Sequence, residues 1–599
     1  MATNNLQAGD VVTFAIKVNG NALPDELSIL SVTVEKKVNG ITKAAIIIAD
    51  GDPATGTFNA SSSPVFVPGA LIAIEAGYDN SNKVIFKGII TGQNLRINDT
   101  TGPVLEVICY DAAIKMTVGR KNTAYNDKTD GEIISSLIQS YAGLSANIAA
   151  TAKAWPAQVQ YDVSDWDYML VLAEANGLTV TTINGVVSVA APTNNTAPVC
   201  SIIYGDGLLE FNASLNAVDQ LGNVKASAWD YISQEVNSGQ VTPMLSNSPG
   251  NLSTKKLSEV IGLDTFNLQT TAPLDTEDLT SWSKAQMLRS EFSKITGQAK
   301  FLGTNLIEPA NYITLGGLGD RFSGDHFISG VTHTIAEGNW FTEVSIGMPA
   351  TWFTRQTDII TPPAAGLLPA ARGLLNGTVK QTGDDPQGQY RILVDIPVLN
   401  SCDAGIWARL SNFYASNGAG AFFLPEAGDE VLVGFLNEDP RFPVILGSMY
   451  SSKAHKPYQG IDSSNENRIK AIVSRSGISI EFDEMDKTLT ICTPAKNSIV
   501  FSDKDKQVLV NDENGNSLLL NTAGISINSP KDIHISSGQR VNIQGAQGVN
   551  ITSSGGDVAL TGINIQETAQ VQYSVAASAM ANIQAGGELS LKGAIIMIN

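Results

Sequence analysis

Charge, cysteine and long hydrophobic runs are all scarce in this sequence. Charged residues make up 16% of its 599 residues, and its four cysteines (Cys109, Cys200, Cys402 and Cys492) lie far apart without a C-x-x-C motif. Such cysteines indicate assembly in a reducing compartment, where buried thiols act as small hydrophobes. There is no run of 18 apolar residues, and the N-terminus, MATNNLQAGD, lacks the basic and apolar regions of a secretory signal. We therefore expect no transmembrane helix and no signal peptide.

Positive charge is also in short supply. Lysine and arginine number 38 against 58 acidic residues, which gives a formal net charge of −20. This balance argues against a general binder of nucleic acid or anionic membranes, because both carry dense negative charge. Hydrophobic residues make up 43% of the chain, a composition typical of folded proteins, and the length suggests about four domains.

Sequence motifs of the common enzyme classes are missing. No G-x-S-x-G, H-E-x-x-H or P-loop motif is present. Several carboxylates could suggest acid–base chemistry, but they stand beside proline and glycine in expected turns, where such side chains cap backbone amides. These groups are Asp384-Asp385, Glu426/Asp429/Glu430 and Glu438-Asp439. We expect structural roles for them and no catalytic residue.

Metal and ligand sites are not expected either. His326 and His333 share one expected hairpin arm, seven residues apart, so the alternation of a strand predicts that they lie on opposite faces. We expect them at the hairpin surface or core edge. The acidic turn at 502–506 lacks the Asp/Asn and Gly that a calcium loop needs. The aromatics Trp407, Phe413, Phe422 and Phe423 are predicted to fill a barrel core, and no cofactor is expected.

The last stretch, 533–599, has a regular pattern of apolar pairs at i and i+2. The pairs are Ile533/Ile535, Val541/Ile543, Val549/Ile551, Val558/Leu560, Ile563/Ile565, Val571/Tyr573, Leu589/Leu591 and Ile596/Ile598. Successive pairs begin mostly eight residues apart, with Gly, Ser, Gln and Asn between them. This period predicts short strands joined by tight turns, as in a solenoid. Such strands cannot enclose a core from one thin chain, so we expect several copies to wind together into a needle.

The rest of the chain reads mainly as strands. We predict a first β-barrel at 1–110, an α+β insert at 111–198 with helices at 129–141 and 164–176, and a second barrel at 199–360 with a helix at 276–296. A Pro/Ala/Gly linker at 361–372 precedes an OB-type barrel at 373–450. A further linker at 451–475 leads to a β-meander collar and the β-helix needle at 476–599.

Three segments resemble one known family. FSGDHFISGVTHTI with WFTEV, within 319–348, resembles the closing hairpin of the hub in spike proteins of contractile tails. GTVKQTGDDPQGQYRILVDIP resembles the opening of the OB barrel in those spikes. The run at 423–450 is similar to the closing signature of that barrel, through Pro425, Glu426, Gly428, Asp429 and Glu430. The family includes VgrG proteins of type VI secretion, phage baseplate hubs and spikes of extracellular particles.

The resemblance implies a fold and a function. It implies a mainly β homotrimer with two hub β-barrels, a small α+β insert, an OB-type barrel and a C-terminal trimeric β-helix needle. The hub ring would match a hexameric inner tube or tube-adaptor protein within a baseplate, and the needle would pierce the target membrane mechanically. Some relatives carry a lysozyme or effector domain. Because the link at 451–475 is too short for one and the sequence stops in the needle, we expect no enzyme. Assembly in the bacterial cytoplasm is implied, with delivery outside the cell or into the target envelope.

The last residues form the one expected binding site. Ile595, Ile596, Met597, Ile598 and Asn599 would make a flat apolar platform where three needle chains meet. In similar spikes a small PAAR-type tip protein sits there, so we expect such a partner, together with effector cargo. Two alternatives stay open. One is a trimeric tailspike or adhesin that acts on surface carbohydrate, and the other is a spike with a hidden enzymatic activity.

Overall fold

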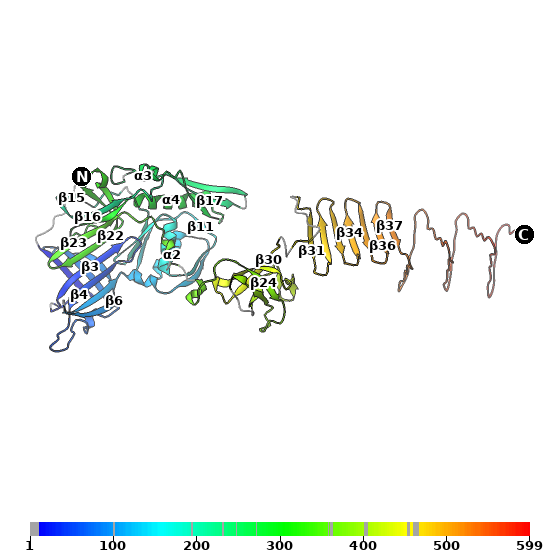
Figure 1. Ribbon diagram of the computed structural model, residues 1–599, viewed down its shortest axis with the longest axis horizontal. Helices are drawn as coiled ribbons and strands as arrows, with labels where there is room; N and C mark the ends of the chain where they lie inside the picture. Colours follow the sequence, from blue (N-terminus) through cyan, green and yellow to red (C-terminus); the bar gives the residue numbers. More distant parts are fainter. Residues whose placement is uncertain are drawn as a thin grey trace. The chain divides into compact units, whose positions relative to one another are not determined.

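The computed structural model describes residues 11–598, except 25, 100–101, 193–195, 231–232, 247, 271, 357–358, 360–362, 400–404, 452–455 and 459–465. The chain divides into two compact units, Met1–Met449 and Tyr450–Asn599, and each is described by itself. Strands dominate both (Figure 1), so the predicted mainly β class is confirmed. No helix in the described part of the chain is long and apolar enough to cross a membrane.

A 13-stranded sheet forms much of the first unit (Figure 1). Its order is β2-β1-β5-β6-β7-β4-β3-β22-β21-β15-β16-β20-β23. An additional pairing of β22 with β23 closes the last six strands into a ring, which is the predicted second barrel. The strands are β1 Val12–Val18, β2 Asn21–Ala22, β3 Ile29–Lys37, β4 Lys43–Ala49, β5 Leu71–Tyr78, β6 Lys83–Asn98, β7 Gly102–Tyr110, β15 Cys200–Tyr204, β16 Gly207–Leu215, β20 Ile295–Leu302, β21 Tyr312–Gly316, β22 Gly324–Ala336 and β23 Asn339–Ile346.

Strand alternation places the core inside this sheet. In β4, Ala44, Ile46 and Ile48 are buried while the residues between them are half-buried, as the period of two predicts. The first seven strands surround one apolar cluster that also includes Ile335 and Trp340 of the ring. Their described pairings run from β2 to β3 without joining the two ends. Strand β3 instead pairs with β22, so the two barrels share a continuous hydrogen-bonded seam.

The α+β insert has a core of its own, built around two helices. Helix α1, Asp130–Gln139, begins with a capping box between Thr129 and Glu132, and α2, Asp165–Ala175, begins at Ser164 as its N-cap. Both helices bury their apolar stripes against a small sheet. The other elements are η2 Ala112–Thr117, β8 Lys121–Tyr125, β9 Lys128–Thr129, β10 Ser145–Ile148, β11 Ala154–Trp155, β12 Gln158–Val163, β13 Thr179–Ile183 and β14 Val186–Ala190.

A second small sheet covers helix α4, Thr276–Phe292. The predicted helix at 276–296 ends four residues early, because Ile295 and Thr296 pair with β16 as part of β20. Leu279 of α4 packs with Ala226 and Ala228 of the small sheet. The small sheet consists of β17 Val224–Asp230, β18 Glu235–Val241 and β19 Phe266–Thr270. Other short elements of the first unit are α3 Thr254–Ile261, α5 Gly319–Phe322, η1 Pro64–Phe66 and η3 Phe353–Arg355.

The OB-type barrel is closed in the order β24-β25-β26-β30-β29. Its core is small and aliphatic, with Val379, Ile392, Val394, Val431 and Ile445 among its buried members. Its elements are η4 Pro363–Gly366, β24 Leu375–Gln381, β25 Ile392–Asp395, η5 Pro397–Leu399, β26 Ile406–Leu410, β27 Ala415–Ser416, β28 Ala419–Gly420, β29 Glu430–Phe435, η6 Leu436–Glu438 and β30 Pro443–Ser448. The predicted OB-type barrel is therefore confirmed.

The second unit contains a seven-stranded antiparallel meander (Figure 1). Its strands are β31 Ile469–Val473, β32 Ser479–Asp483, β33 Thr488–Cys492, β34 Ser498–Ser502, β35 Gln507–Asn511, β36 Ser517–Asn521 and β37 Gly524–Asn528. Over 529–598 the single chain has no strand or helix, although Figure 1 draws it as a series of regular loops. The β-helix needle expected there stays a prediction, since its rungs were expected to form only between copies.

Candidate assembly surfaces

One face of the meander carries two continuous apolar columns. Residues that pair directly across antiparallel strands point to the same face of a sheet, and so do residues at i and i+2. The first column runs Ile480, Ile491, Ile499, Val510, Leu518 and Ile527. The second runs Phe482, Leu489, Phe501, Val508, Leu520 and Ile525. The sheet thus presents one apolar surface, which we call the collar face.

The collar face is not covered by the described residues of the second unit. Ile525 is 73% exposed and Phe501 is 46% exposed, whereas Val34 of the first barrel is fully buried. None of the six buried clusters in the described part of the chain includes a residue of the second unit. Monomeric proteins rarely expose an apolar surface as continuous as this one. The collar face is therefore the candidate surface for association.

The apolar pairs beyond the meander repeat one local geometry. In three successive pairs the first residue is about half exposed and the second more so, as at Val541/Ile543 and Val549/Ile551. Equal exposure at a spacing of eight residues is what a repeat of that length predicts, whereas the order of exposure is reversed at Ile563/Ile565 and Val571/Tyr573. Toward the C-terminus, Ile595 to Ile598 are exposed as well, while Asn599 lies outside the described residues. The platform predicted at 595–599 is not tested by these positions.

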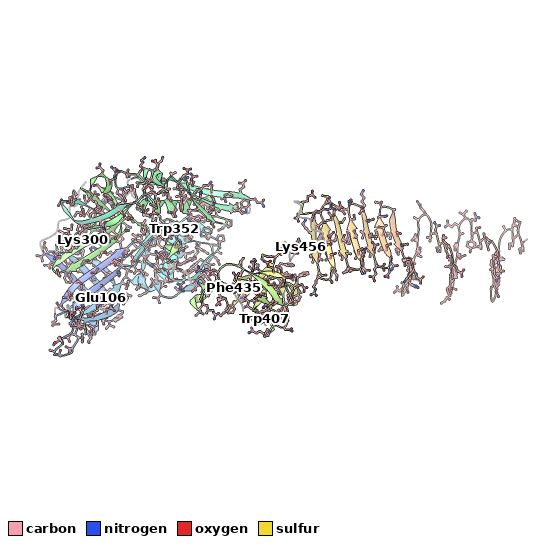
Figure 2. The ribbon with its side chains drawn as sticks, in the orientation of Figure 1. Glu106, Lys300, Trp352, Trp407, Phe435 and Lys456 are labelled. Carbon is pink, nitrogen blue, oxygen red and sulfur yellow. The ribbon has the colours of Figure 1, made fainter. Side chains whose placement is uncertain are left out.

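Aromatic residues of the OB-type barrel correct one prediction. Phe413, Phe422 and Phe423 were expected in the barrel core, but Phe413 is 90% exposed and the other two are exposed as well. They flank the β27–β28 hairpin, which pairs with itself outside the closed barrel. The barrel interior is already filled by Val, Ile and Ala. Trp407, labelled in Figure 2, is half-buried with the Arg391 guanidinium 6.0 Å from its ring centroid.

The OB signature residues shape a turn. Gly428 has a φ of 97°, and its N–H donates to the Val379 carbonyl at 2.7 Å. The Asp429 carboxylate accepts from the Glu426 N–H at 2.8 Å, which closes the turn that follows Pro425. Glu430 starts β29, and its carboxylate accepts from the Asn376 side chain at 2.8 Å. The signature therefore fixes the entry into β29, and its carboxylates hold backbone or amide groups.

The other candidate carboxylates also act in turns. Asp385 accepts from the backbone N–H groups of Gln387 and Gln389 and from the Arg391 guanidinium. That arginine holds the pKa of Asp385 well below its usual range. Asp439 is bound in the same way by Arg441, which lowers its pKa. Carboxylates held as anions by arginine are poor general acids or bases at neutral pH, which agrees with the structural roles expected for them.

Both histidines of the hairpin are buried, which corrects the expected surface or core-edge position. His326 and His333 are each 1% exposed. A register irregularity in β22 between Ile328 and Gly330 changes the alternation, so residues seven apart both face inward. Burial lowers the pKa of His333 to about 3, with the nearby Lys36 cation adding to the effect. No group of three metal-ligating side chains occurs among the described residues.

A buried ion pair holds the segment that follows β23. The Glu174 carboxylate of α2 pairs with the Arg289 guanidinium of α4 and accepts from the Phe353 N–H at 2.8 Å. Arg289 also donates to the Thr351 carbonyl at 2.6 Å, and its guanidinium lies 5.0 Å from the Trp352 ring centroid. Trp352 is labelled in Figure 2 at the place where Figure 1 draws α2 and α4. Residues 351–353 are thereby tied to both helices.

We call this arrangement of Glu174, Arg289 and the Phe353 N–H the clasp. It was not predicted from the sequence. Burial lowers the pKa of Arg289 to about 10, so it remains a cation at neutral pH and can hold the Glu174 anion. Glu174 was the available signal, because it is a carboxylate within the otherwise apolar helix MLVLAEA. Its partners could not be found from sequence, since they lie 115 and 179 residues away.

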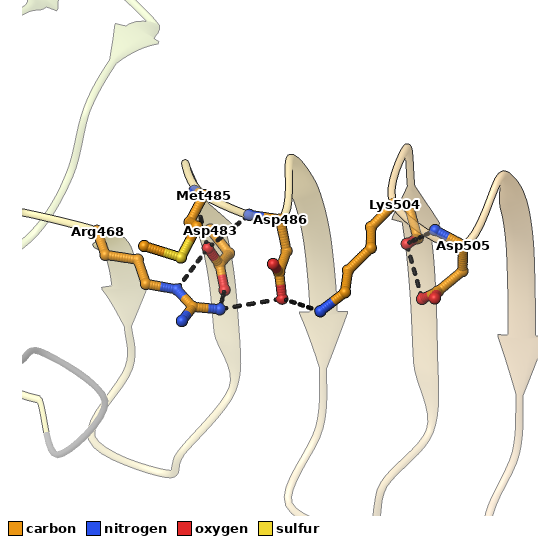
Figure 3. A network of polar contacts seen from close by, with 7 residues as sticks. Arg468, Asp483, Met485, Asp486, Lys504 and Asp505 are labelled. Atoms are coloured by element: carbon orange, nitrogen blue, oxygen red, sulfur yellow. Dashed lines mark hydrogen bonds and ion pairs between the residues drawn. The ribbon is translucent and has the colours of Figure 1, made fainter.

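Charged side chains line one edge of the meander (Figure 3). Arg468 binds Asp483 through its Nε at 2.8 Å and also binds Asp486 at 3.0 Å. Lys504 reaches the same Asp486 at 2.9 Å, so the network crosses successive turns. In the turn at 502–506, Ser502 donates to Asp505, a hydrogen bond within the turn rather than a calcium site.

Comparison with known proteins gives two family matches within the chain. Residues 8–337 match the family described as the Alg8 N-terminal domain. Residues 375–450 match the type VI secretion system/phage-baseplate injector OB domain. The predicted resemblance to VgrG-like spikes is thereby confirmed.

Curated relatives are similar over a short part of their length. The chain is 30% identical to type VI secretion system spike protein VgrG1a of Pseudomonas aeruginosa over 83 residues, 14% of this chain and 13% of that protein. It is 30% identical to VgrG3 of Vibrio cholerae over 101 residues, 15% of this chain and 10% of that protein. The chain thus matches about an eighth or less of the length of these relatives.

Solved structures align over more of the chain. A 43 kDa tail protein of a Shewanella oneidensis prophage aligns with 57% of this chain and 99% of its own, at 10% identity and a TM-score of 0.45. The Escherichia coli c3393 protein, a type VI secretion component, aligns with 72% of this chain and 99% of its own, at 15% identity and a TM-score of 0.39.

Proposed function

This chain belongs to the Alg8 N-terminal domain family, and from that premise we propose that it is the homotrimeric spike of a contractile injection machine. The collar face carries the proposal. Two apolar columns run unbroken through six strands, and the described residues of the second unit do not bury them. The match of residues 375–450 to an injector OB domain supports the same function, because that domain directly precedes the collar.

Three copies are the arrangement that the resemblance to spike proteins implies for this single-layer sheet. Three such sheets, each turning its collar face inward, would form a prism with an apolar interior. The columns of all three collar faces would then be buried. The apolar pairs of 533–598 would continue that interior as a β-helix needle, with each copy covering the next. The exposed Phe413, Phe422 and Phe423 would lie against a neighbouring copy in the same assembly.

The proposed mechanism is mechanical. Contraction of a sheath would drive an inner tube and the spike below it toward the target envelope, and the needle would break the membrane. The hub would bind the hexameric inner tube or a tube adaptor within a baseplate. The clasp of Glu174 and Arg289 fits this role, because it anchors the segment after β23 to two helices. We propose no catalytic activity, since the candidate carboxylates are engaged in turns.

A tip protein is part of the proposal. Ile595 to Ile598 are exposed and apolar, which suits a platform for a small PAAR-type protein that caps the needle. Deletion of 595–599 should leave the trimer intact and abolish co-purification of that protein. Tip binding that survives the deletion would contradict this part of the proposal.

Sedimentation and electron microscopy test the main claim. The purified full-length chain should sediment as a trimer, and particles from the producing cells should show it at the end of a tube. A folded monomer at micromolar concentration would contradict the proposal. The alternative, a trimeric tailspike or adhesin, predicts a trimer that binds or cleaves surface polysaccharide and occurs without a sheath or tube.

A further inference from the structure

A positively charged cavity lies between the first barrel and the α+β insert. Its volume is about 430 Å³. One wall is the outer face of strands β1, β5 and β6, and the other consists of η2 and two turns of the insert. The lysines of this cavity, Lys17, Lys87 and Lys115, come from three elements, and we call the cavity the lysine socket.

The register of the sheet explains why the socket is open. Lys17 pairs with Ala73, and Ala73 pairs with Lys87, so the two lysines flank an alanine on one face. Adjacent strands are about 4.8 Å apart, which separates the two lysine backbones by roughly 10 Å. The methyl group of Ala73 leaves the space between the two stems unfilled.

The opposite wall leaves the space open as well. Besides Lys115 and Asn184 it is formed by Ala112, Ala142, Gly143 and Gly185, none of which has a side chain larger than a methyl group. Gly185 has a φ of 85°, and a Cβ there would lie 2.8 Å from the Gly143 carbonyl. Only glycine fits this turn without strain, so the socket is a fixed feature of the fold.

Charge in the socket is poorly compensated. Lys17 is paired with Glu75 at 2.7 Å. Lys115 reaches only the Ala142 carbonyl, at 3.4 Å, and Lys87 has no ion-pair or hydrogen-bond partner in the described part of the chain. Two cations are therefore left over in a cavity whose walls are otherwise largely aliphatic. This is unusual in a chain of net charge −20.

We propose that the lysine socket receives an acidic side chain from a separately folded partner protein of the injection particle. A carboxylate on a short aliphatic stem matches both the ammonium groups and the apolar wall formed by residues such as Leu71 and Ile89. This inference rests on the proposed function, which places the hub among tube and baseplate proteins, and it names the chemistry by which one of them would bind.

The location of the apolar surfaces favours a partner over a second copy. Obligate contacts between copies are rich in apolar area, while contacts between separately folded proteins are more polar. The apolar columns of the collar face lie at 480–527, and the exposed Phe413, Phe422 and Phe423 flank a hairpin of the OB-type barrel. The socket lies at 17–185 and is charged. It is therefore suited to a partner that docks onto the folded spike.

Zero-length crosslinking of purified particles tests the proposal. A carbodiimide joins a lysine amine to a carboxylate only when the two are in direct contact. We expect Lys87 or Lys115 to be joined to an aspartate or glutamate of a different protein. We also expect both lysines to be acetylated more slowly in the particle than in the free spike. Lys83, exposed on the same strand β6 and outside the socket, is the internal control and should react equally in both.

Variants give an independent test. Lys87→Glu with Lys115→Glu should lower incorporation of the spike into particles by roughly tenfold or more, because it places like charges against the partner's acid. Lys87→Arg and the control Lys83→Glu should incorporate normally, and all variants should remain trimeric. Crosslinks to another copy of this chain, or unchanged reactivity of Lys87 in the particle, would overturn the inference. A spike that is never found in a particle would instead contradict the proposed function.

Discussion

Strands β4 and β37 each place two isoleucines, two residues apart, on one face of a sheet, yet these side chains differ completely in burial. Ile46 and Ile48 of β4 are fully buried within the first barrel, whereas Ile525 and Ile527 of β37 are mostly exposed. Burial of one isoleucine side chain is worth about 1.5–3 kcal/mol. The first unit gains this free energy within one chain. The second unit can gain it only from other copies, so the two regions should differ in how their stability depends on association.

The largest effect is expected from a charge in the collar face. Phe501→Asp would place a carboxylate within an apolar column, where an unpaired charge is strongly unfavourable, and would do so in every copy. We expect the trimer to be lost while the first unit stays folded. Sedimentation and near-UV circular dichroism of the full-length chain measure the two outcomes.

Glu513→Lys is the matched control for that variant. Glu513 is exposed in a turn of the same sheet, outside both columns, and the trimer should survive the change of charge there. If Phe501→Asp remains trimeric, the collar face is not the association surface. The exposed isoleucines of β37 would then not be buried by other copies in the way that those of β4 are buried by their own chain.

A smaller effect is expected within the first unit. Glu174→Ala would leave the Arg289 cation buried without its partner and the Phe353 N–H without an acceptor. Removal of one partner of a buried ion pair costs roughly 3–5 kcal/mol. Denaturant unfolding followed by tryptophan fluorescence should show this loss, and hydrogen exchange should speed up at 351–354. The trimer should persist, since the clasp lies in the first unit.

Glu235→Ala is the control for the clasp. Glu235 is exposed at the start of β18, and its loss should change the free energy of unfolding by no more than about 0.5 kcal/mol. Equal effects of the two substitutions would mean that Glu174 contributes only as a surface charge.

Acid should lower the stability of the first unit by a smaller, graded amount. Burial lowers the pKa of His333 to about 3 from an ordinary value of 6.5. At a pH between these two pKa values the unfolded chain binds a proton that the folded chain does not. The free energy of unfolding therefore falls as the pH drops from about 6.5 towards 3. The groups around the ring are Lys36, which pairs with Glu308, together with Trp340 and Thr342. None of them offers the imidazolium a nearby free carboxylate.

The measurement is the slope of stability against pH. His333→Gln removes the titrating ring, so the first unit should lose less stability between pH 6.5 and 5 than the parent, whatever its stability at pH 7. His534→Gln, at an exposed position of the second unit, should leave the slope unchanged. A slope that His333→Gln does not alter would show that His333 is protonated in the folded state.

Local pattern was enough to predict much of this fold. Alternation predicted strands in both units, and apolar periodicity predicted helices at 129–141 and 164–176, where the structure has α1 and α2. Phe413 was expected in the core because it is aromatic. The side-chain type alone does not reveal that aliphatic residues already fill the barrel interior. Strict alternation also failed at the irregularity in β22, which turns His333 inward.

Features built from distant segments could not be predicted. The clasp joins residues 174, 289 and 353, and the lysine socket joins strands β1, β5 and β6 to turns of the insert. Neither has a local signature, because each depends on which segments the fold brings together. The collar face differs, because its columns follow from strand alternation and hairpin register. The columns were not predicted, whereas the need for other copies was predicted from the apolar pairs of 533–599.

The smallest effect is expected at the charged edge of the meander. Lys504 is 60% exposed and pairs with Asp486 at 2.9 Å beside Arg468 (Figure 3). Exposed pairs of this kind contribute little to stability, because water screens them and ordering the side chains costs entropy. Lys504→Gln should therefore leave the trimer intact and lower its melting temperature by no more than a degree or two, and 0.5 M salt should weaken the parent only as much as the variant. A large loss on this substitution would mean that the charged edge, rather than the apolar columns, holds the copies together. In that case strong salt should also dissociate the parent trimer, an outcome that burial of the columns does not allow.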